Sequence, residues 1–224
     1  MTENALVQEN QVEQKGAHCF PGFLTQQEIS HYLELIQNKE HVFRDIHGKL
    51  GMNLPYHVFD GIDLQQHLPE LVTLAKERVY PLAQQHIQTP VELMQDTRRA
   101  LRIQRYQAKN EGFKWHIDGG TYSAILTLKN TNEGETQWLS PRQSRFLYPA
   151  PYILPFQPLL SLLPAAKMKP KAGDLLLIRG GDIVHRGICR LEQGERMVFV
   201  ITFDPVGKPK KWLWEWFARR LNYR

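Results

Sequence analysis

Apolar residues recur at helical spacing in two segments of the first half of the chain. In the first segment they follow the i, i+3, i+4, i+7 rule: Ile29, Tyr32, Leu33 and Ile36. Thr25 and Glu28 stand just ahead, with the spacing of a capping box. The second segment starts near Pro69, a favourable first-turn residue, and Pro81 is expected to kink or end it. Both segments are predicted to be helices that cover one side of the remaining chain.

From residue 98 onward the pattern changes to short runs that are rich in β-branched and aromatic residues. Gly, Pro and Asn separate these runs. The runs are ALRIQRYQA, FKWHID, TYSAILTLKN, ETQWLS, GDLLLIRG and RMVFVITF. Such a succession of short strands predicts an antiparallel sandwich or barrel.

One long segment interrupts the strand pattern. It lies between Trp138 and Gly173 and is too proline-rich for a helix or a central strand. A loop of this length in a compact domain is commonly a lid or a binding loop, and its apolar content argues against simple disorder. Residues 139–170 are therefore predicted to be a lid-like insertion.

Length and composition suit a single domain. The chain has 224 residues and 42% hydrophobic content, enough for one substantial core. We place this domain at residues 16–224, behind a flexible leader over residues 1–15 that is rich in Gln, Glu and Asn. The formal net charge of +5 is modest and discriminates weakly between classes of anionic partner, and no nucleic acid partner is expected.

Cysteine usage and hydropathy bear on the compartment. Cys19 and Cys189 are far apart and form no CxxC pattern, so neither a disulfide framework nor a thiolate zinc site is indicated. The N-terminal stretch lacks the basic start and apolar run of a signal peptide, and no apolar run is long enough to span a bilayer. A cytoplasmic location is expected.

The stretch FKWHIDGG carries the strongest chemical signal. His116 and Asp118 are two residues apart in a strand-like run, so both side chains point to the same face. His185, which follows the run GDLLLIR, is the best third ligand. Two histidines and one carboxylate form the facial triad that holds iron(II), although zinc sites have similar ligand counts. Without the third ligand, a polar strand face or a metal-free His–Asp pair is the preferred explanation of the motif.

Arg196 begins the run RMVFVITF, in which alternate residues share a face. Arg196, Val198, Val200 and Thr202 are on one of these faces. A buried guanidinium is costly unless a carboxylate reaches it, and its fork suits a bidentate carboxylate, so a diffusible diacid is a suitable partner. The alternative is a surface ion pair at the start of the strand.

The order of these residues resembles that of the iron(II)- and 2-oxoglutarate-dependent dioxygenases, over roughly residues 20–205. Further motifs resemble the prolyl 4-hydroxylase-like branch of that superfamily. They are FPGFLTQQE near the first helix, Arg105-Tyr106 ahead of the HxD pair, GETQW at 134–138 and KAGDLL at 171–176. Two departures are Asn132-Glu133 ahead of a single Gly134, and Arg196 where the branch often has lysine.

The resemblance implies a fold and a site. The fold class would be α+β, mainly β, as a double-stranded β-helix (jelly roll) with N-terminal covering helices. Iron(II) would be bound by the triad His116, Asp118 and His185. Arg196 would pair with the distal carboxylate of 2-oxoglutarate, Tyr106 would line the cosubstrate pocket, and Thr127 would add a hydroxyl contact. O2 is the second cosubstrate, and ascorbate is a further cofactor candidate.

The implied activity is hydroxylation of an aliphatic C–H bond of a small molecule, with succinate and CO2 as coproducts. Asp118 occupies the position that is a small residue in halogenating relatives, so hydroxylation is favoured over halogenation. Hydroxylation of a peptide or protein residue, as in prolyl hydroxylases, is one alternative. A jelly-roll binding module without turnover is another.

Two segments rich in basic residues have more than one structural interpretation. Residues 208–224 hold three of the five tryptophans among Lys and Arg, and are expected to form a basic aromatic helix. Packing on the domain is ranked ahead of a homodimer contact and of a peripheral membrane contact. Four arginines cluster just before the HxD motif: Arg98, Arg99, Arg102 and Arg105. A solvated face is the preferred interpretation of that cluster, ahead of contact with an anionic substrate.

Overall fold

A computed structural model describes residues 11–47, 55–107, 111–131, 133–147 and 157–207. The α-helices are α2 (Gln11–Lys15), α3 (Gln26–Gln37), α4 (Gly61–His67), α5 (Pro69–Leu74), α6 (Tyr80–His86), α7 (Thr97–Ala100), α8 (Pro141–Leu147) and α9 (Gln157–Leu160). A 3-10 turn, η1, spans Glu40–Val42, and a π-helical turn, η2, spans Ala75–Val79.

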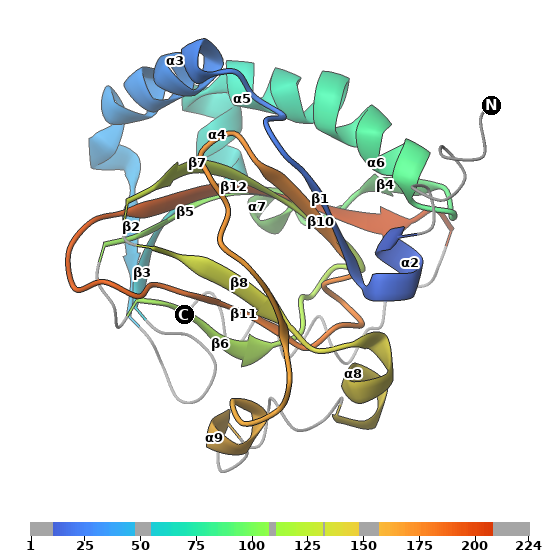
Figure 1. Cartoon of the computed structure of the whole chain (residues 1–224). Coiled ribbons are helices and arrows are strands. Elements are labelled where there is room, and N and C mark those ends of the chain that lie inside the picture. Colours follow the sequence, from blue (N-terminus) through green and yellow to red (C-terminus); the bar gives the residue numbers. More distant parts are fainter. Residues whose placement is uncertain (1–10, 48–54, 108–110, 132, 148–156, 208–224) are drawn as a thin grey trace.

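The strands form two antiparallel sheets, which Figure 1 shows facing each other. The larger contains β1 (Ala17–Phe20), β10 (Leu175–Ile178), β7 (Tyr122–Asn130), β12 (Arg196–Pro205), β5 (Leu101–Tyr106), β3 (Tyr56–Phe59) and β2 (Arg44–Ile46) in that order, with β4 (Val91–Leu93) also paired to β12. The smaller contains β6 (Gly112–His116), β11 (His185–Ile188), β8 (Glu135–Trp138) and β9 (Ala166–Met168). The predicted antiparallel sandwich is thus confirmed, and the arrangement is consistent with a jelly roll.

The first predicted helix is confirmed with its cap. Thr25 Oγ1 accepts from the backbone N–H of Glu28, and the Glu28 carboxylate accepts from the backbone N–H of Thr25. In the second segment, helix α5 begins at Pro69, but Pro81 does not end the helical path. The chain widens into the π turn η2 just before Pro81, which accommodates a residue without an N–H, and α6 then continues to His86.

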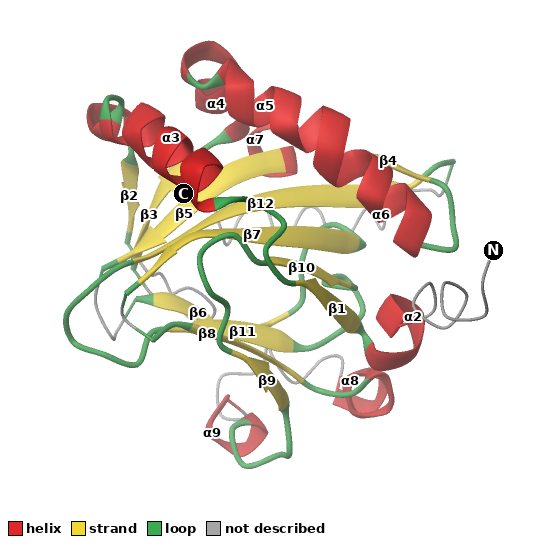
Figure 2. Ribbon diagram, turned by 45° about the horizontal axis from the view of Figure 1, so that its top comes forward, coloured by secondary structure: helices red, strands yellow, loops and turns green. Residues whose placement is uncertain are grey.

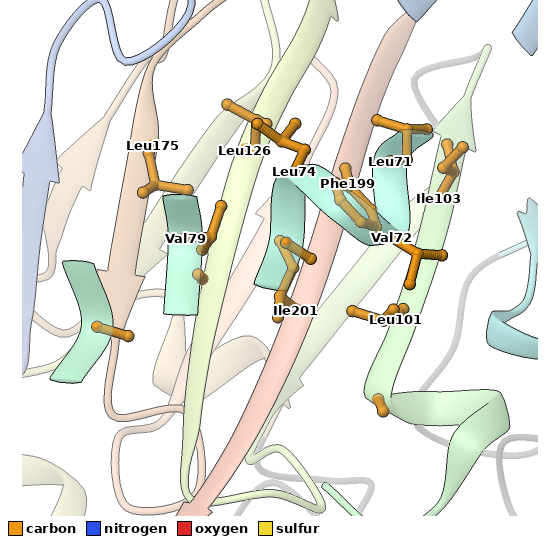
Figure 3. Close-up of a cluster of buried hydrophobic side chains, with 14 of the residues drawn as sticks. Leu71, Val72, Leu74, Val79, Leu101, Ile103, Leu126, Leu175, Phe199 and Ile201 are labelled. Atoms are coloured by element: carbon orange, nitrogen blue, oxygen red, sulfur yellow. The ribbon is translucent and has the colours of Figure 1, made fainter. Parts of the chain in front are cut away.

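The main core lies between these helices and the outer face of the large sheet. Figure 2 shows α3, α4, α5 and α6 on that side. In Figure 3, helix residues such as Leu71 and Val79 face sheet residues such as Leu126 and Phe199. Each such fully buried side chain contributes about 1.5–3 kcal/mol relative to an exposed one. The opposite face of the large sheet is directed toward the small sheet.

The described parts of the predicted insertion, 139–147 and 157–170, pack on the small sheet. Figure 1 shows α8 and α9 beyond this sheet, on the side away from the large sheet. The side-chain amide of Gln157 bonds to the backbone N and O of Trp115, and Trp115 Nε1 donates to Ser161 Oγ. The expectation of no helix was wrong here, because prolines occupy the first turns of both helices. The expectation of no central strand is confirmed for the described residues, since β9 pairs only at the sheet edge.

Three other expectations concern the ends of the chain and the membrane. Residues 11–15 of the predicted leader form α2, whose Val12 is fully buried and whose Glu13 accepts from the Tyr122 hydroxyl. Residues 208–224 lie outside the described part of the chain, so the basic aromatic helix stays a prediction. Among the described helices, none has the length and apolar character needed to cross a bilayer.

Candidate metal centre

The two predicted histidine ligands are cross-strand neighbours. His116 is the last residue of β6 and His185 the first of β11, and their Cα atoms are paired across the small sheet. Their ring centroids lie 4.2 Å apart. Asp118 follows β6 by two residues, so it extends the face on which His116 lies. Antiparallel pairing therefore brings together residues that are distant in the sequence.

The three side chains converge on one point. His116 Nε2 lies 3.3 Å from Asp118 Oδ1, and His185 Nε2 lies 3.6 Å from Asp118 Oδ2. One ligand atom from each residue falls within 4.8 Å of the other two. With metal–ligand bonds of about 2.1 Å, two ligand atoms at right angles lie about 3 Å apart, so these separations are close to those of a metal site.

Hydrogen bonds fix the orientation of both imidazoles. His116 Nδ1 donates to the Lys114 carbonyl and His185 Nδ1 donates to the Ile183 carbonyl, each at 2.8 Å. Because a carbonyl oxygen only accepts, the proton of each neutral ring resides on Nδ1. Both Nε2 lone pairs are then directed at the common point, as in metal-binding histidines whose other nitrogen is held by a carbonyl.

The protonation states also suit a divalent metal. Burial, followed by repulsion from His116, lowers the pKa of His185 to about 4, so this imidazole is neutral near pH 7. Burial by itself would raise the pKa of Asp118, but the facing imidazoles of His185 and His116 outweigh it and lower that pKa. A neutral His185 and an ionised Asp118 suit the two-histidine, one-carboxylate donor set of non-heme iron(II) sites with open positions.

Two neighbours of Asp118 carried no signal in the sequence. Ser123 Oγ donates to Asp118 Oδ2 at 2.6 Å, and Asp118 N donates to the Gly180 carbonyl at 2.8 Å. A Cβ atom at Gly180 would lie 2.2 Å from Asp118 Oδ2, a distance that real Cβ contacts do not show. Glycine at position 180 therefore leaves the space that the Asp118 carboxylate occupies.

The triad opens into a cavity between the two sheets. Among the lining residues are His116, Asp118 and His185, together with Tyr106 and Arg196 from the large sheet. None of the described residues of the insertion 139–170 lines this cavity. Its predicted lid role consequently finds no support in the described residues and stays a prediction for 148–156, which lie outside them.

Arg196 is a buried charge without a carboxylate partner among the described residues. It is 2% exposed, and its Nη1 and Nη2 donate to the Glu135 carbonyl and to Thr136 Oγ1. Its Nε is buried and has no hydrogen-bond partner in the described part of the chain. The alternative of a surface ion pair with Glu192 or Glu195 is contradicted by the burial of Arg196, and the Glu195 carboxylate pairs with Lys129 instead.

Of the other two predicted cosubstrate residues, Tyr106 lines the cavity and Thr127 does not. Tyr106 is the Cα partner of Arg196, lines the cavity, and donates its hydroxyl to Gln104 Oε1 at 2.7 Å. Burial raises the pKa of Tyr106, which keeps its hydroxyl protonated. Thr127 is buried in β7 but does not line the cavity. The hydroxyl beside Arg196 belongs to Thr136, within the GETQW motif, and that motif was the available signal.

The preferred interpretation of the four clustered arginines was wrong for two of them. Arg99 and Arg105 are 5% and 7% exposed, so they are not part of a solvated face. Arg98 and Arg105 pair with acids away from the cavity, whereas Arg99 and Arg102 line it. Strand alternation does separate Arg102, which shares the Tyr106 face, from Arg105 on the opposite face.

The fold is similar to that of several solved structures, some of which are described as non-heme alpha ketoglutarate dependent enzymes. One solved structure, described as the non-heme alpha ketoglutarate dependent epimerase SnoN from nogalamycin biosynthesis, is 15% identical, with a TM-score of 0.69 over 93% of this chain and 87% of SnoN. HygX from Streptomyces hygroscopicus, with nickel, 2-oxoglutarate and hygromycin B bound, is 12% identical, with a TM-score of 0.65 over 94% of this chain and 90% of HygX.

A third structure, AviO1 from Streptomyces viridochromogenes Tue57, is 15% identical, with a TM-score of 0.67 over 93% of this chain and 98% of AviO1. No family model and no curated protein sequence matches the chain. At these identities the likeness establishes the fold, in agreement with the expected jelly roll. The finer resemblance to the prolyl 4-hydroxylase-like branch stays a prediction.

Proposed function

We propose that this protein is an iron(II)- and 2-oxoglutarate-dependent oxygenase that hydroxylates an aliphatic C–H bond of a small molecule. One observation carries the proposal. The same cavity holds a His–Asp–His triad with both imidazoles oriented by carbonyls and, in Arg196, a buried guanidinium without a carboxylate partner among the described residues. A metal chelator that also ends in a carboxylate satisfies both groups together.

Each residue has a role in this proposal. His116, Asp118 and His185 would hold the iron through two Nε2 atoms and a carboxylate oxygen. Arg196 would receive the distal carboxylate of 2-oxoglutarate through its free Nε, beside the Tyr106 hydroxyl. When bound, iron and 2-oxoglutarate supply the oxidation by O2, with succinate and CO2 released. Ascorbate would serve to keep the iron reduced.

The substrate class is argued by likeness. SnoN is described from nogalamycin biosynthesis and HygX is described with hygromycin B bound, which favours a small molecule over a peptide residue here. SnoN and SnoK are described as an epimerase and a carbocyclase, so the fold hosts other outcomes. Hydroxylation is proposed because Asp118 completes the triad, and a residue of a peptide is the alternative substrate.

The test combines metal binding with turnover. Wild-type protein is titrated anaerobically with iron(II) with and without 2-oxoglutarate, and succinate is then measured in air. We expect 2-oxoglutarate-dependent iron binding and slow succinate formation without a primary substrate. His185→Ala should reduce succinate formation by at least about 100-fold, because loss of one of three ligands removes the facial set.

His31→Ala is the matched control, since His31 is half exposed on α3 and pairs with Glu70 far from the triad. It should form succinate at the wild-type rate. Absence of 2-oxoglutarate-dependent iron binding in the wild type would favour a binding module without turnover. Intact turnover in His185→Ala would reject His185 as a ligand.

A further inference from the structure

The cavity has a second pair of guanidinium groups, away from Arg196. Arg99 in α7 and Arg102 near the start of β5 line it, and Tyr106 lines it at the end of that strand. On β12, the Cα partner of Arg102 is Val200 and that of Tyr106 is Arg196. Four residues along a strand span about 13 Å, so the two basic groups belong to opposite ends of the cavity.

The Arg99 guanidinium is only partly used by the protein. Its side chain is 6% exposed, and its Nε pairs with Asp96 Oδ2 at 2.9 Å. Its Nη2 is buried and, among the described residues, has no hydrogen-bond partner. A buried N–H group without a partner costs free energy, so a ligand oxygen that accepts from Nη2 would recover that cost.

Arg102 has no ion-pair partner in the described part of the chain. Its Nη1 donates to the backbone carbonyl of Arg99 at 2.6 Å and to Thr202 Oγ1 at 3.3 Å, and both of these acceptors are neutral. The nearby carboxylates are Asp96, which pairs with Arg99, and Asp118, which interacts electrostatically with Arg102 and is a proposed iron ligand. With Asp118 bound to a divalent metal, this end of the cavity would retain a positive charge.

The neighbouring arginines show the contrast. Arg98 pairs with Asp60 and Arg105 with Glu40, so each has an acidic partner. Arg105 also stacks over the ring of Phe43, with its guanidinium carbon 4.4 Å from the ring centre. Neither of these two arginines lines the cavity. Within one short segment, Arg98 and Arg105 pair with acids outside the cavity, whereas Arg102, which has no ion-pair partner among the described residues, lines the cavity beside Arg99.

This basic end adjoins the triad. Thr202, which accepts from Arg102, is the Cα partner of Ser123 in the large sheet. Ser123 in turn donates to Asp118 Oδ2. A group held by Arg102 would thus lie on the Asp118 side of the proposed iron, and Arg196 lies at the other end of the cavity.

We propose that Arg99 and Arg102 form a subsite for an anionic oxygen group of the primary substrate, a carboxylate or a phosphate. The inference rests on the proposed function, because it takes the Arg196 end as the place of 2-oxoglutarate. It adds the substrate class: a small acid whose charged group anchors it beside the metal, with the oxidised C–H bond a short distance from that charge.

The test uses full-length protein loaded with nickel(II), which is redox-silent, and 2-oxoglutarate. Hexanoate, hexyl phosphate and the neutral isostere hexanamide are titrated, and dissociation constants are measured by calorimetry. At least one anion should bind about tenfold more tightly than hexanamide, as expected for a hydrogen-bonded ion pair, and the tighter anion identifies the group. Arg102→Met and Arg99→Met should each reduce the preference to about twofold or less.

Arg98→Met is the matched control from the same cluster, and it should keep the full preference. Equal binding of the anions and hexanamide, absence of anion binding, or a preference that survives both substitutions would overturn the subsite. If Arg99→Met folds poorly, the anion preference of the Arg102→Met protein still tests the proposed subsite.

Binding of 2-oxoglutarate to the same proteins separates the two proposals. Arg102→Met should bind it within about twofold of wild type, and a loss comparable to that of Arg196→Met would assign Arg102 to 2-oxoglutarate instead. If the wild type binds no 2-oxoglutarate, the proposed function fails. If it binds 2-oxoglutarate but shows no anion preference, the subsite alone fails.

Discussion

The two faces of strand β12 are equally buried, but only the inner face includes polar and charged side chains. On the outer face, toward the helices, the side chains are Met197, Phe199, Ile201 and Phe203. On the inner face, toward the cavity, they are Arg196, Val198, Val200 and Thr202. None of the eight is more than 5% exposed. Burial therefore does not separate core from site in this molecule, whereas the partners of the buried polar atoms do.

The difference follows from what each face excludes from water. The outer face removes only hydrocarbon, and every such contact favours folding. The inner face keeps a guanidinium whose Nε has no partner among the described residues, which opposes folding unless an anion arrives. Stability is thus concentrated on one side of the strand and binding capacity on the other.

The largest expected effect is a matched pair of isoleucine truncations. Ile201→Ala on the outer face should lower the free energy of unfolding by about 2–5 kcal/mol, because it opens a void in a closed core. Ile125→Ala on the neighbouring strand β7 should cost clearly less, since Ile125 already borders the cavity. Urea titration of both variants measures the difference. Equal losses would mean that the two faces are packed alike.

The second prediction concerns the inner face, where a substitution should affect ligand binding more than stability. Arg196→Met on the inner face should raise the 2-oxoglutarate dissociation constant about 100-fold, or about 2.7 kcal/mol, because the carboxylate loses its charged partner. Stability should change less than in Ile201→Ala, since the substitution also removes an uncompensated buried charge. Arg196→Lys keeps the charge but not the forked guanidinium, so its 2-oxoglutarate dissociation constant should lie between those of the wild type and Arg196→Met. Unchanged 2-oxoglutarate affinity in Arg196→Met would exclude the proposed role.

Sequence reasoning reached the triad because two local rules apply there. The i, i+2 alternation puts His116 and Asp118 on one face, and the position directly after the strand-like run GDLLLIR indicated His185. The same alternation assigned Arg196 to an inward face of β12, and the structure agrees. These inferences need only the strand period and the order of motifs.

Contacts between distant segments were not accessible in this way. Gly180 reaches Asp118 from the loop after β10, and no periodicity marks it. Ser123 is close in sequence, but the short connection from β6 to β7 that turns its hydroxyl toward Asp118 has no periodicity either. Arginines are read as surface residues by composition, so the burial of Arg99 was missed. The proline-rich insertion was read as irregular because its short helices gain their stability from packing on Trp115.

The smallest predicted effect tests whether the inner face of β12 is positioned by its neighbours. Gly134 lies against Arg196: a Cβ at this position would be 2.3 Å from Cδ and 3.1 Å from Cγ of the arginine. The φ angle of Gly134 is not positive, so alanine is compatible with the backbone and the strain falls on the Arg196 side chain.

Gly134→Ala should therefore raise the 2-oxoglutarate dissociation constant about tenfold, or about 1.4 kcal/mol, by displacing the guanidinium from its position beside Thr136. Gly187→Ala is the comparison, because its Cβ would meet Arg196 Nη1 at 3.4 Å, an ordinary contact, and its effect should be smaller. A larger effect from Gly187→Ala would show that β11, and not the GETQW turn, positions Arg196. Unfolding curves for both variants separate the two possible causes of weaker binding. General destabilisation would lower the denaturant midpoint of unfolding together with the affinity for 2-oxoglutarate, whereas displacement of Arg196 would lower the affinity and leave the midpoint nearly unchanged.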